Sequence, residues 1–187
     1  MAIVTIPATG KRISDQAEVT DFLRSAGIDH ETWIGDANLG PDASDDEILA
    51  AYQVKINELK SKGGYVTADV INVTPATPGL DEMLDRFNKE HWHDEDEVRF
   101  IVGGSGLFHI APPGEDVFSV EMSTGDLIRV PAGTLHWFDL CSDRTIRAIR
   151  LFQDPAGWTP HYTGSGVDSG FAPLCFGDRY FPAAGQA

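Results

Sequence analysis

Apolar residues in the first ninety positions recur at helical spacing. Ser14 or Asp15 can cap a first predicted helix, which runs to about Ala26. Gly27 follows it, and glycine readily takes the left-handed conformation in which many helices end. The pattern therefore predicts a helix that ends where this glycine stands.

A second predicted helix has stronger signals. Ser44 and Glu47 match the S-x-x-E capping box. One helical face then collects the apolar side chains of Ile48, Ala51, Tyr52, Ile56 and Leu59. Gly63 and Gly64 end this helix. A strand over about 65–73 and a short helix over 81–88 are expected next.

After residue 90 the pattern changes to short β segments separated by turn residues. The predicted strands are 97–102, 106–110, 116–122, 126–130, 136–140 and 145–152. The breaks between them include Gly103-Gly104 and Pro112-Pro113-Gly114. Closely spaced strands without intervening helices favour an antiparallel barrel or jelly roll. The chain beyond Trp158 is rich in Gly and Pro and is expected to form a loop packed on the outside.

The length and composition suit one globular domain. The chain has 187 residues, of which 42% are hydrophobic and 23% are charged. We expect a single domain over 1–187, with a mixed α/β part (1–90), a barrel core (91–155) and a C-terminal loop or tail (156–187). The predicted class is α+β, mainly β, with the N-terminal helices packed on the outside.

Charge excludes several partners. Fourteen Lys and Arg stand against 29 Asp and Glu, which gives a net charge of −15. We expect no nucleic-acid binding, which needs a basic surface, and no attachment to anionic lipid. No apolar stretch is long enough to span a membrane, and no signal peptide is expected. Cys141 and Cys175 are too few for a disulfide framework, so a cytoplasmic location is expected.

Candidate chemistry begins directly after residue 90. His91, His93 and Glu97 form the pattern H-x-H-x-x-x-E. In an extended chain, residues of the same parity share a face, so these side chains are expected to converge. Two imidazoles and a carboxylate suit Fe, Ni, Mn, Cu or Zn. The alternative is structural, because a single His in a β region is commonly a satisfied polar residue and an acidic run such as 94–97 a solvated turn.

A second motif supports the metal interpretation. Residues 125–136 read G-x5-P-x-G-x2-H and end on His136. Gly104 lies seven residues after Glu97, which gives E-x6-G. The two patterns resemble the motifs of the cupin superfamily. This resemblance implies a cupin β-barrel or jelly roll, in which His136 comes from a strand across the barrel as the fourth ligand beside the H-x-H-x-x-x-E residues.

Two further residues are expected to face the barrel interior. Arg99 shares the parity of Glu97, and Phe138 shares that of His136. A buried arginine needs an anionic partner. That partner is either an internal Asp or Glu, or an anionic substrate held by metal and guanidinium together. Phe138 fits a place in the barrel core as well as a place in a pocket wall.

Longer strings point to a family. The segments EHWHDEDEVRFIVGGSGLFHI, DLIRVPAGTLHWFDL and AIRLFQDPAGW are similar to acireductone dioxygenases of methionine salvage. The strings H-x-H-x-E-D-E-V-R-F, V-P-A-x-T-x-H-W-F-D and P-x-G-W are more specific than a cupin motif. The resemblance covers nearly the whole chain and is weakest at the start and after about Thr163.

The resemblance implies a site and a reaction. The family's ligands to one Fe²⁺ or Ni²⁺ per chain fall on His91, His93, Glu97 and His136. Its substrate-anion arginine falls on Arg99, and its apolar wall on Phe87, Phe138 and Trp158. The implied substrates are O₂ and acireductone, 1,2-dihydroxy-3-keto-5-methylthiopentene. The implied products are formate and 4-methylthio-2-oxobutanoate with Fe²⁺, or formate, carbon monoxide and 3-methylthiopropanoate with Ni²⁺.

Several alternatives stay open at this point. A cupin barrel with these ligands also suits a dioxygenase that cleaves a flavonol or another enediol, or a non-catalytic module that binds a small molecule. The sequence does not choose between Fe²⁺ and Ni²⁺, because the same ligands serve both. A monomer is expected by resemblance alone. Cys141 and Cys175 are expected to be free thiols packed as small hydrophobes.

Overall fold

The computed structural model describes residues 1–34, 39–40 and 42–171. Its strands are β1 (Ile3–Ile6), β2 (Lys11–Ile13), β3 (Asp29–Thr32), β4 (Thr67–Val73), β5 (His91–Trp92), β6 (Glu97–Ile110), β7 (Phe118–Ser123), β8 (Asp126–Val130), β9 (His136–Leu140), β10 (Ile146–Phe152) and β11 (His161–Tyr162). Its helices are α1 (Gln16–Ser25), α2 (Asp45–Ala51), α3 (Gln53–Gly63), α4 (Leu80–Phe87) and the 3₁₀ helix η1 (Val167–Gly170).

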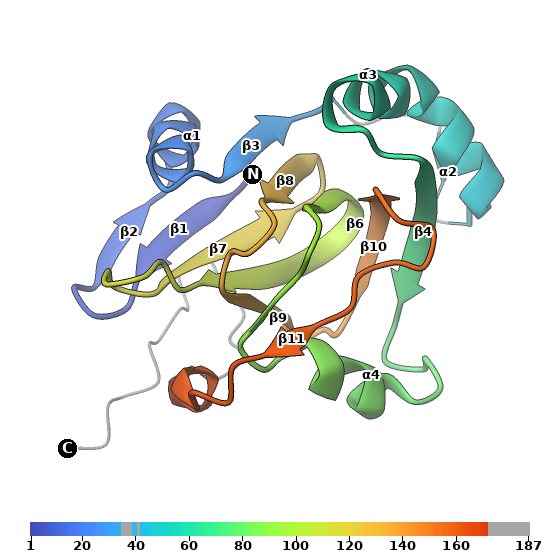
Figure 1. Ribbon diagram of the computed structural model, residues 1–187. Helices are drawn as coiled ribbons and strands as arrows, with labels where there is room; N and C mark the ends of the chain where they lie inside the picture. The colour runs from blue at the N-terminus through green and yellow to red at the C-terminus, as the bar shows by residue number, and fades with distance from the viewer. Residues whose placement is uncertain (35–38, 41, 172–187) are drawn as a thin grey trace.

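Two antiparallel sheets share the long strand β6 (Figure 1). The first half of β6 pairs with β8 and β10, and this sheet extends to β3 and β4. The second half pairs with β7 and β9, and this sheet extends to β1, β2, β5 and β11. The two sheets enclose the barrel that the turn-rich sequence predicted.

A bulge in β6 keeps one face of the strand turned inward in both sheets. Arg147 pairs with Gly103 and Ala148 with Ile101, so Val102 is an extra residue on the β6 side. Odd-numbered Ile101 and even-numbered Phe108 therefore belong to the same buried cluster. Gly104 allows the bend, because its φ is +75°.

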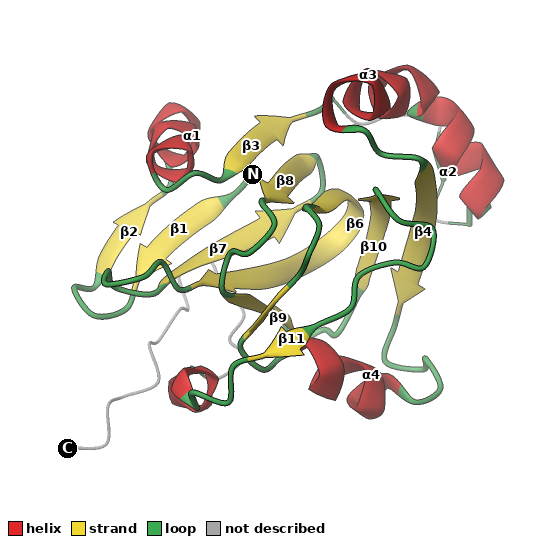
Figure 2. Cartoon of the chain, viewed as in Figure 1, coloured by secondary structure: helices red, strands yellow, loops and turns green. Residues whose placement is uncertain are grey.

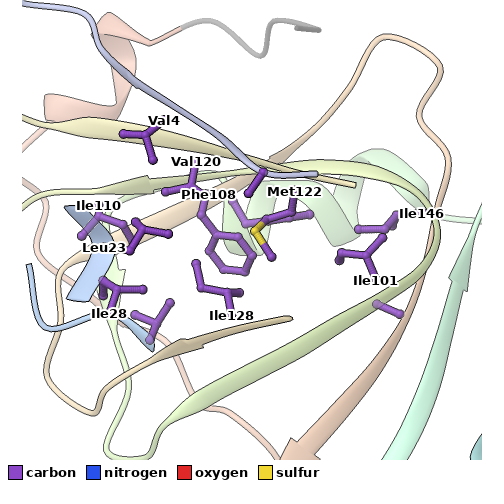
Figure 3. Packing of buried hydrophobic residues seen from close by; sticks show 14 of the residues in the cluster. Val4, Leu23, Ile28, Ile101, Phe108, Ile110, Val120, Met122, Ile128 and Ile146 are labelled. Carbon is purple, nitrogen blue, oxygen red and sulfur yellow. The ribbon is translucent and has the colours of Figure 1, made fainter. Parts of the chain in front are cut away.

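The core lies inside the barrel, and the helices lie outside the sheets (Figure 2). Figure 3 shows part of this interior cluster, which includes Phe108, Ile128 and Leu23 of α1. A second cluster joins α2 and α3 to the outer face of β6 through Ile48 and Phe100. Burial of such side chains contributes roughly 1.5–3 kcal/mol each. The predicted fold class, mainly β with helices outside, is confirmed.

Most predicted elements are present. The α1 helix is capped by Asp15, whose carboxylate accepts the N–H groups of Ala17 and Glu18. Ser44 and Glu47 form the predicted capping box. The single helix predicted after it was wrong, since it is broken at Tyr52 into α2 and α3. The break coincides with packing of the Tyr52 ring, whose centroid lies 4.7 Å from that of Phe100.

Other differences concern strands. The predicted break at Gly103-Gly104 was wrong, because both residues pair with β10 just after the bulge, within a continuous strand. Strands β1, β2 and β3 were not predicted. The segment after Trp158, expected to be a loop, includes β11, which pairs with β5. Cys175 and the rest of the tail, 172–187, lie outside the described residues. Within the described part, no helix is both long and apolar enough to cross a membrane.

Candidate metal centre

Four side chains converge at one end of the barrel. His91 lies on β5, His93 follows that strand, Glu97 opens β6, and His136 opens β9. Their ligand atoms all lie within 4.8 Å of one another, and all four residues are buried. Direct pairing of His91 with His136 across β5 and β9 places the two motifs side by side.

Backbone carbonyls fix the orientation of the three imidazoles. The Nδ1 atom of His91 lies 2.6 Å from the Lys89 carbonyl oxygen. His93 Nδ1 is 2.9 Å from the Thr159 oxygen, and His136 Nδ1 is 2.8 Å from the Thr134 oxygen. A carbonyl accepts a hydrogen bond, so each Nδ1 carries a proton and each neutral ring presents a bare Nε2. Metal-binding histidines commonly have this arrangement.

The bare nitrogens face a carboxylate, which requires a cation between them. Glu97 Oε2 lies 3.1 Å from His93 Nε2 and 3.2 Å from His136 Nε2. Two acceptors at this distance repel each other unless a proton or a metal ion lies between them. His91 Nε2 is buried and has no hydrogen-bond partner. A metal ion bound by all four residues satisfies each of these atoms, so the residues fit such an ion.

The ionisation of the ligands suits metal binding. Burial, and next the proximity of the His136 imidazole, lower the pKa of His91 to about 4, so this ring is neutral at pH 7. Burial alone would raise the pKa of Glu97, but the charge of Arg99 and the close contacts with His136 and His93 hold it well below its usual range. Neutral imidazole and ionised carboxylate are the forms that bind metals.

Arg99 lies beside the four candidate metal ligands, and its guanidinium is surrounded by aromatic rings. Its Nε donates to Glu97 Oε1 at 2.7 Å. Within the described part of the chain, its terminal nitrogens make no hydrogen bond, so they remain for another anion. The guanidinium carbon lies 4.5 Å from the ring centre of Phe138, 5.4 Å from Trp158, 5.5 Å from Phe108 and 6.0 Å from Phe87. Arg99 thus pairs with an internal carboxylate, that of Glu97, through Nε, and its terminal nitrogens leave room for an anionic substrate as well.

Two neighbouring cavities share lining residues close to this arginine. An inner chamber of about 20 Å³ is lined by Arg99 and by apolar residues that include Ile71, Leu84 and Ile146. An outer recess of about 410 Å³ lies beside it and includes Trp158. Phe87 and Arg150 line both cavities, and Arg150 is held by Asp69 at 2.6 and 2.9 Å.

The structure brings together every residue that the sequence singled out for the site. Phe108 and Arg150 were missed. Phe108 has the opposite parity to Glu97, so without knowledge of the β6 bulge it was expected to face outward. Arg150 belongs to no motif that distinguishes it from the other polar residues of β10. Asp96 was missed because it resembles a solvated turn residue. Its carboxylate instead accepts bonds from Tyr65, Arg129 and the Ala132 N–H at 3.0–3.1 Å.

Known proteins share this arrangement of the chain. A family model described as the ARD/ARD' family matches residues 6–160. An acireductone dioxygenase of Picosynechococcus sp. is 45% identical over 162 residues, which cover 87% of this chain and 92% of the relative. One of Exiguobacterium sibiricum is 40% identical over 177 residues, which cover 90% and 99%.

A solved structure supports the same assignment. The acireductone dioxygenase from Bacillus anthracis with a cadmium ion in its active centre has a TM-score of 0.80 to this chain and 39% sequence identity. The match covers 87% of this chain and 98% of that one. The sequence strings, the converged ligands and these relatives agree, and the chain belongs to the acireductone dioxygenase family.

Proposed function

We propose that this protein is a metal-dependent dioxygenase that cleaves acireductone with O₂ in methionine salvage. The observation that supports this most directly is the buried cluster of His91, His93, Glu97 and His136 with Arg99 beside it. A bound metal would supply a Lewis acid and a template for an ionised enediol. The family assignment supplies the substrate.

The chain's own residues prepare the substrate for cleavage. Arg99 binds the delocalised negative charge of the enediolate through its terminal nitrogens. Rings of Phe87, Phe138 and Trp158 exclude water around it, which strengthens this attraction. The inner chamber receives the methylthio tail, because its lining is apolar apart from the two arginines. His91, His93, Glu97 and His136 hold the metal.

The metal determines the products in this proposal. With Fe²⁺ we expect formate and 4-methylthio-2-oxobutanoate. With Ni²⁺ we expect formate, carbon monoxide and 3-methylthiopropanoate. The ligand set of three imidazoles and one carboxylate accepts either ion, so one ion of either kind is expected per chain.

Metal loading with product analysis tests the function. Metal-free protein is loaded with Fe²⁺ or Ni²⁺, acireductone is added, and O₂ uptake and carbon monoxide are measured. We expect uptake with both metals and carbon monoxide only with Ni²⁺. No uptake with either metal would overturn the enzyme assignment and favour a non-catalytic binding protein.

We also propose that the protein is a cytoplasmic monomer. The low number of cysteines supports a reducing compartment, and the family resemblance supports the monomer. Light scattering after size exclusion would give the mass in solution, and cell fractionation would give the location.

A further inference from the structure

Gly106 lies where no side chain fits beside the aromatic rings around Arg99. It is on the half of β6 that pairs with β9, directly opposite Leu140. A Cβ added to Gly106 would lie 2.6 Å from Cε2 of Phe138 and closer still to Cζ of the same ring. Carbon atoms do not approach this closely, so any side chain at position 106 must displace that ring.

This glycine is required for space and not for backbone conformation. The described glycines with positive φ include Gly104 but not Gly106. An alanine at 106 therefore meets no backbone penalty of the left-handed kind. The clash with Phe138 is the reason for a glycine here.

The neighbours of the Phe138 ring restrict where it can move. Phe108 packs edge-on against Phe138 with ring centres 5.0 Å apart and is fully buried, so that side is closed. Ile146 Cδ1 would lie 3.1 Å from the added Cβ, so the new side chain is also confined on its Ile146 side. The guanidinium of Arg99 and the inner chamber lie beside the same ring, on a side that Phe108 does not occupy. A side chain at 106 thus pushes the ring into the chamber.

We propose that Gly106 is a specificity-determining position for the tail of the substrate. With no side chain there, Phe138 lies back against β6 and leaves the chamber beside Arg99 open for an apolar tail. Gly106 itself acts only through Phe138 and touches no reacting atom, so it is a positioning residue. The inference rests on the proposed function, which supplies the tailed substrate.

Kinetics with substrates of different tail length test the proposal. We compare Gly106→Ala with wild type on acireductone and on a homologue with a methyl group in place of the methylthioethyl tail. The kcat/KM for acireductone divided by that for the short-tailed homologue should fall about 10-fold or more in Gly106→Ala, because the displaced ring fills the space for the longer tail. Metal content should stay at the wild-type level. Gly103→Ala is the matched control, since its Cβ would meet nothing closer than Arg147 Cβ at 3.8 Å.

A second background separates the ring clash from a general loss of stability. In Phe138→Leu, the ring atoms that meet the added Cβ are absent. Adding Gly106→Ala to that variant should leave its tail preference and its thermal stability unchanged. An equal shift in both backgrounds would overturn the proposal. If Gly106→Ala fails to fold, a folded double variant supports the ring clash, and an unfolded double variant overturns it.

A crystal structure of Gly106→Ala gives a test that does not depend on turnover. The Phe138 ring should lie closer to Arg99 than in the wild type, and an unmoved ring would overturn the proposal. Failure of the wild type to consume acireductone would instead overturn the proposed function, and the ring position would still decide the role of Gly106. An unchanged tail preference in Gly106→Ala, with an active wild type, overturns this inference alone.

Discussion

The four consecutive acidic side chains Asp94 to Glu97 each have a different partner. Asp94 pairs with His161 of β11 at 2.6 Å. Glu95 accepts two backbone N–H groups of residues 153–154, both at 2.9 Å. Asp96 contacts the loop before β9, and Glu97 is one of the four candidate metal ligands. At the scale of single residues, this run is a junction between distant segments and not a solvated turn.

Removal of Arg99 should separate catalysis from metal binding. We expect Arg99→Ala to keep near-stoichiometric metal, because all four ligands remain. Its kcat/KM should fall roughly 100-fold or more, as for other removed donors to a developing anion. Steady-state kinetics with metal analysis checks this. An Arg99→Ala enzyme of wild-type activity would contradict the assigned role.

Asp96 should affect how long the metal stays bound. Its carboxylate joins the first motif to Ala132 of the second. Asp96→Asn replaces one acceptor oxygen with a donor and loosens this connection. We expect metal release to an excess of chelator to accelerate by roughly 10- to 100-fold. Asp94→Asn, whose partner His161 is partly exposed, should release metal at nearly the wild-type rate; equal rates for both variants would refute the role of Asp96.

Asp126 predicts an acid-sensitive part of the stability. Burial alone would raise its pKa, but the nearby His30 imidazole, 3.5 Å away, and the hydrogen bond from the Ser123 N–H outweigh burial and lower the pKa overall. A carboxylate with a lowered pKa stabilises the fold above its ordinary pKa, near 4. That contribution is lost as the pH falls through the lower, folded-state value. Denaturant titrations from pH 6 to 3 should therefore show a smaller acid loss in Asp126→Asn; an equal loss would contradict this.

Among the elements, β6 determines the site most directly. Its first half presents Glu97 and Arg99, and its second half presents Gly106 and Phe108 to the same interior. Only the extra residue Val102 makes both sets face inward. A strand without the bulge would turn one set to the outside.

The bend of β6 should be intolerant of substitution. A Cβ on Gly104 would overlap the Thr145 carbonyl, whose carbon would lie 2.8 Å away, and φ there is +75°. We expect Gly104→Ala to lose about 3 kcal/mol or more of unfolding free energy. Gly114 also has positive φ but open surroundings, so Gly114→Ala should lose only about 1–2 kcal/mol. Equal losses in the two variants, measured by denaturant unfolding, would exclude the clash.

The same strand shows what a sequence can and cannot predict. Parity within a short extended segment is local, so His91, His93, Glu97 and Arg99 could be selected directly. The bulge depends on pairing with β10, far along the chain, and the Gly103-Gly104 pair was therefore taken for a turn. The segment after Trp158 has no periodic pattern. Its pairing with β5 forms only when the barrel brings the two segments together, so no local pattern predicts it.

The net negative charge of the whole molecule repels the anionic substrate that the arginines of the site attract. The net charge is −15, and Arg99 and Arg150 at the site are each paired with a carboxylate. We expect kcat/KM for the anionic enediol to rise about two-fold between low and physiological salt, because screening weakens the repulsion. Saturated kcat should not change. A fall in kcat/KM with added KCl would show that the local positive charge dominates.

The bond between His93 and the Thr159 carbonyl has a consequence for biosynthesis. All four ligand residues leave the ribosome before Thr159 does, yet the tautomer of His93 is fixed only when that carbonyl arrives. Thr163 and Ser165 then bind Glu90, next to His91, and complete the enclosure. We therefore expect the four ligands to reach their final arrangement only after residues 159–165 are in place.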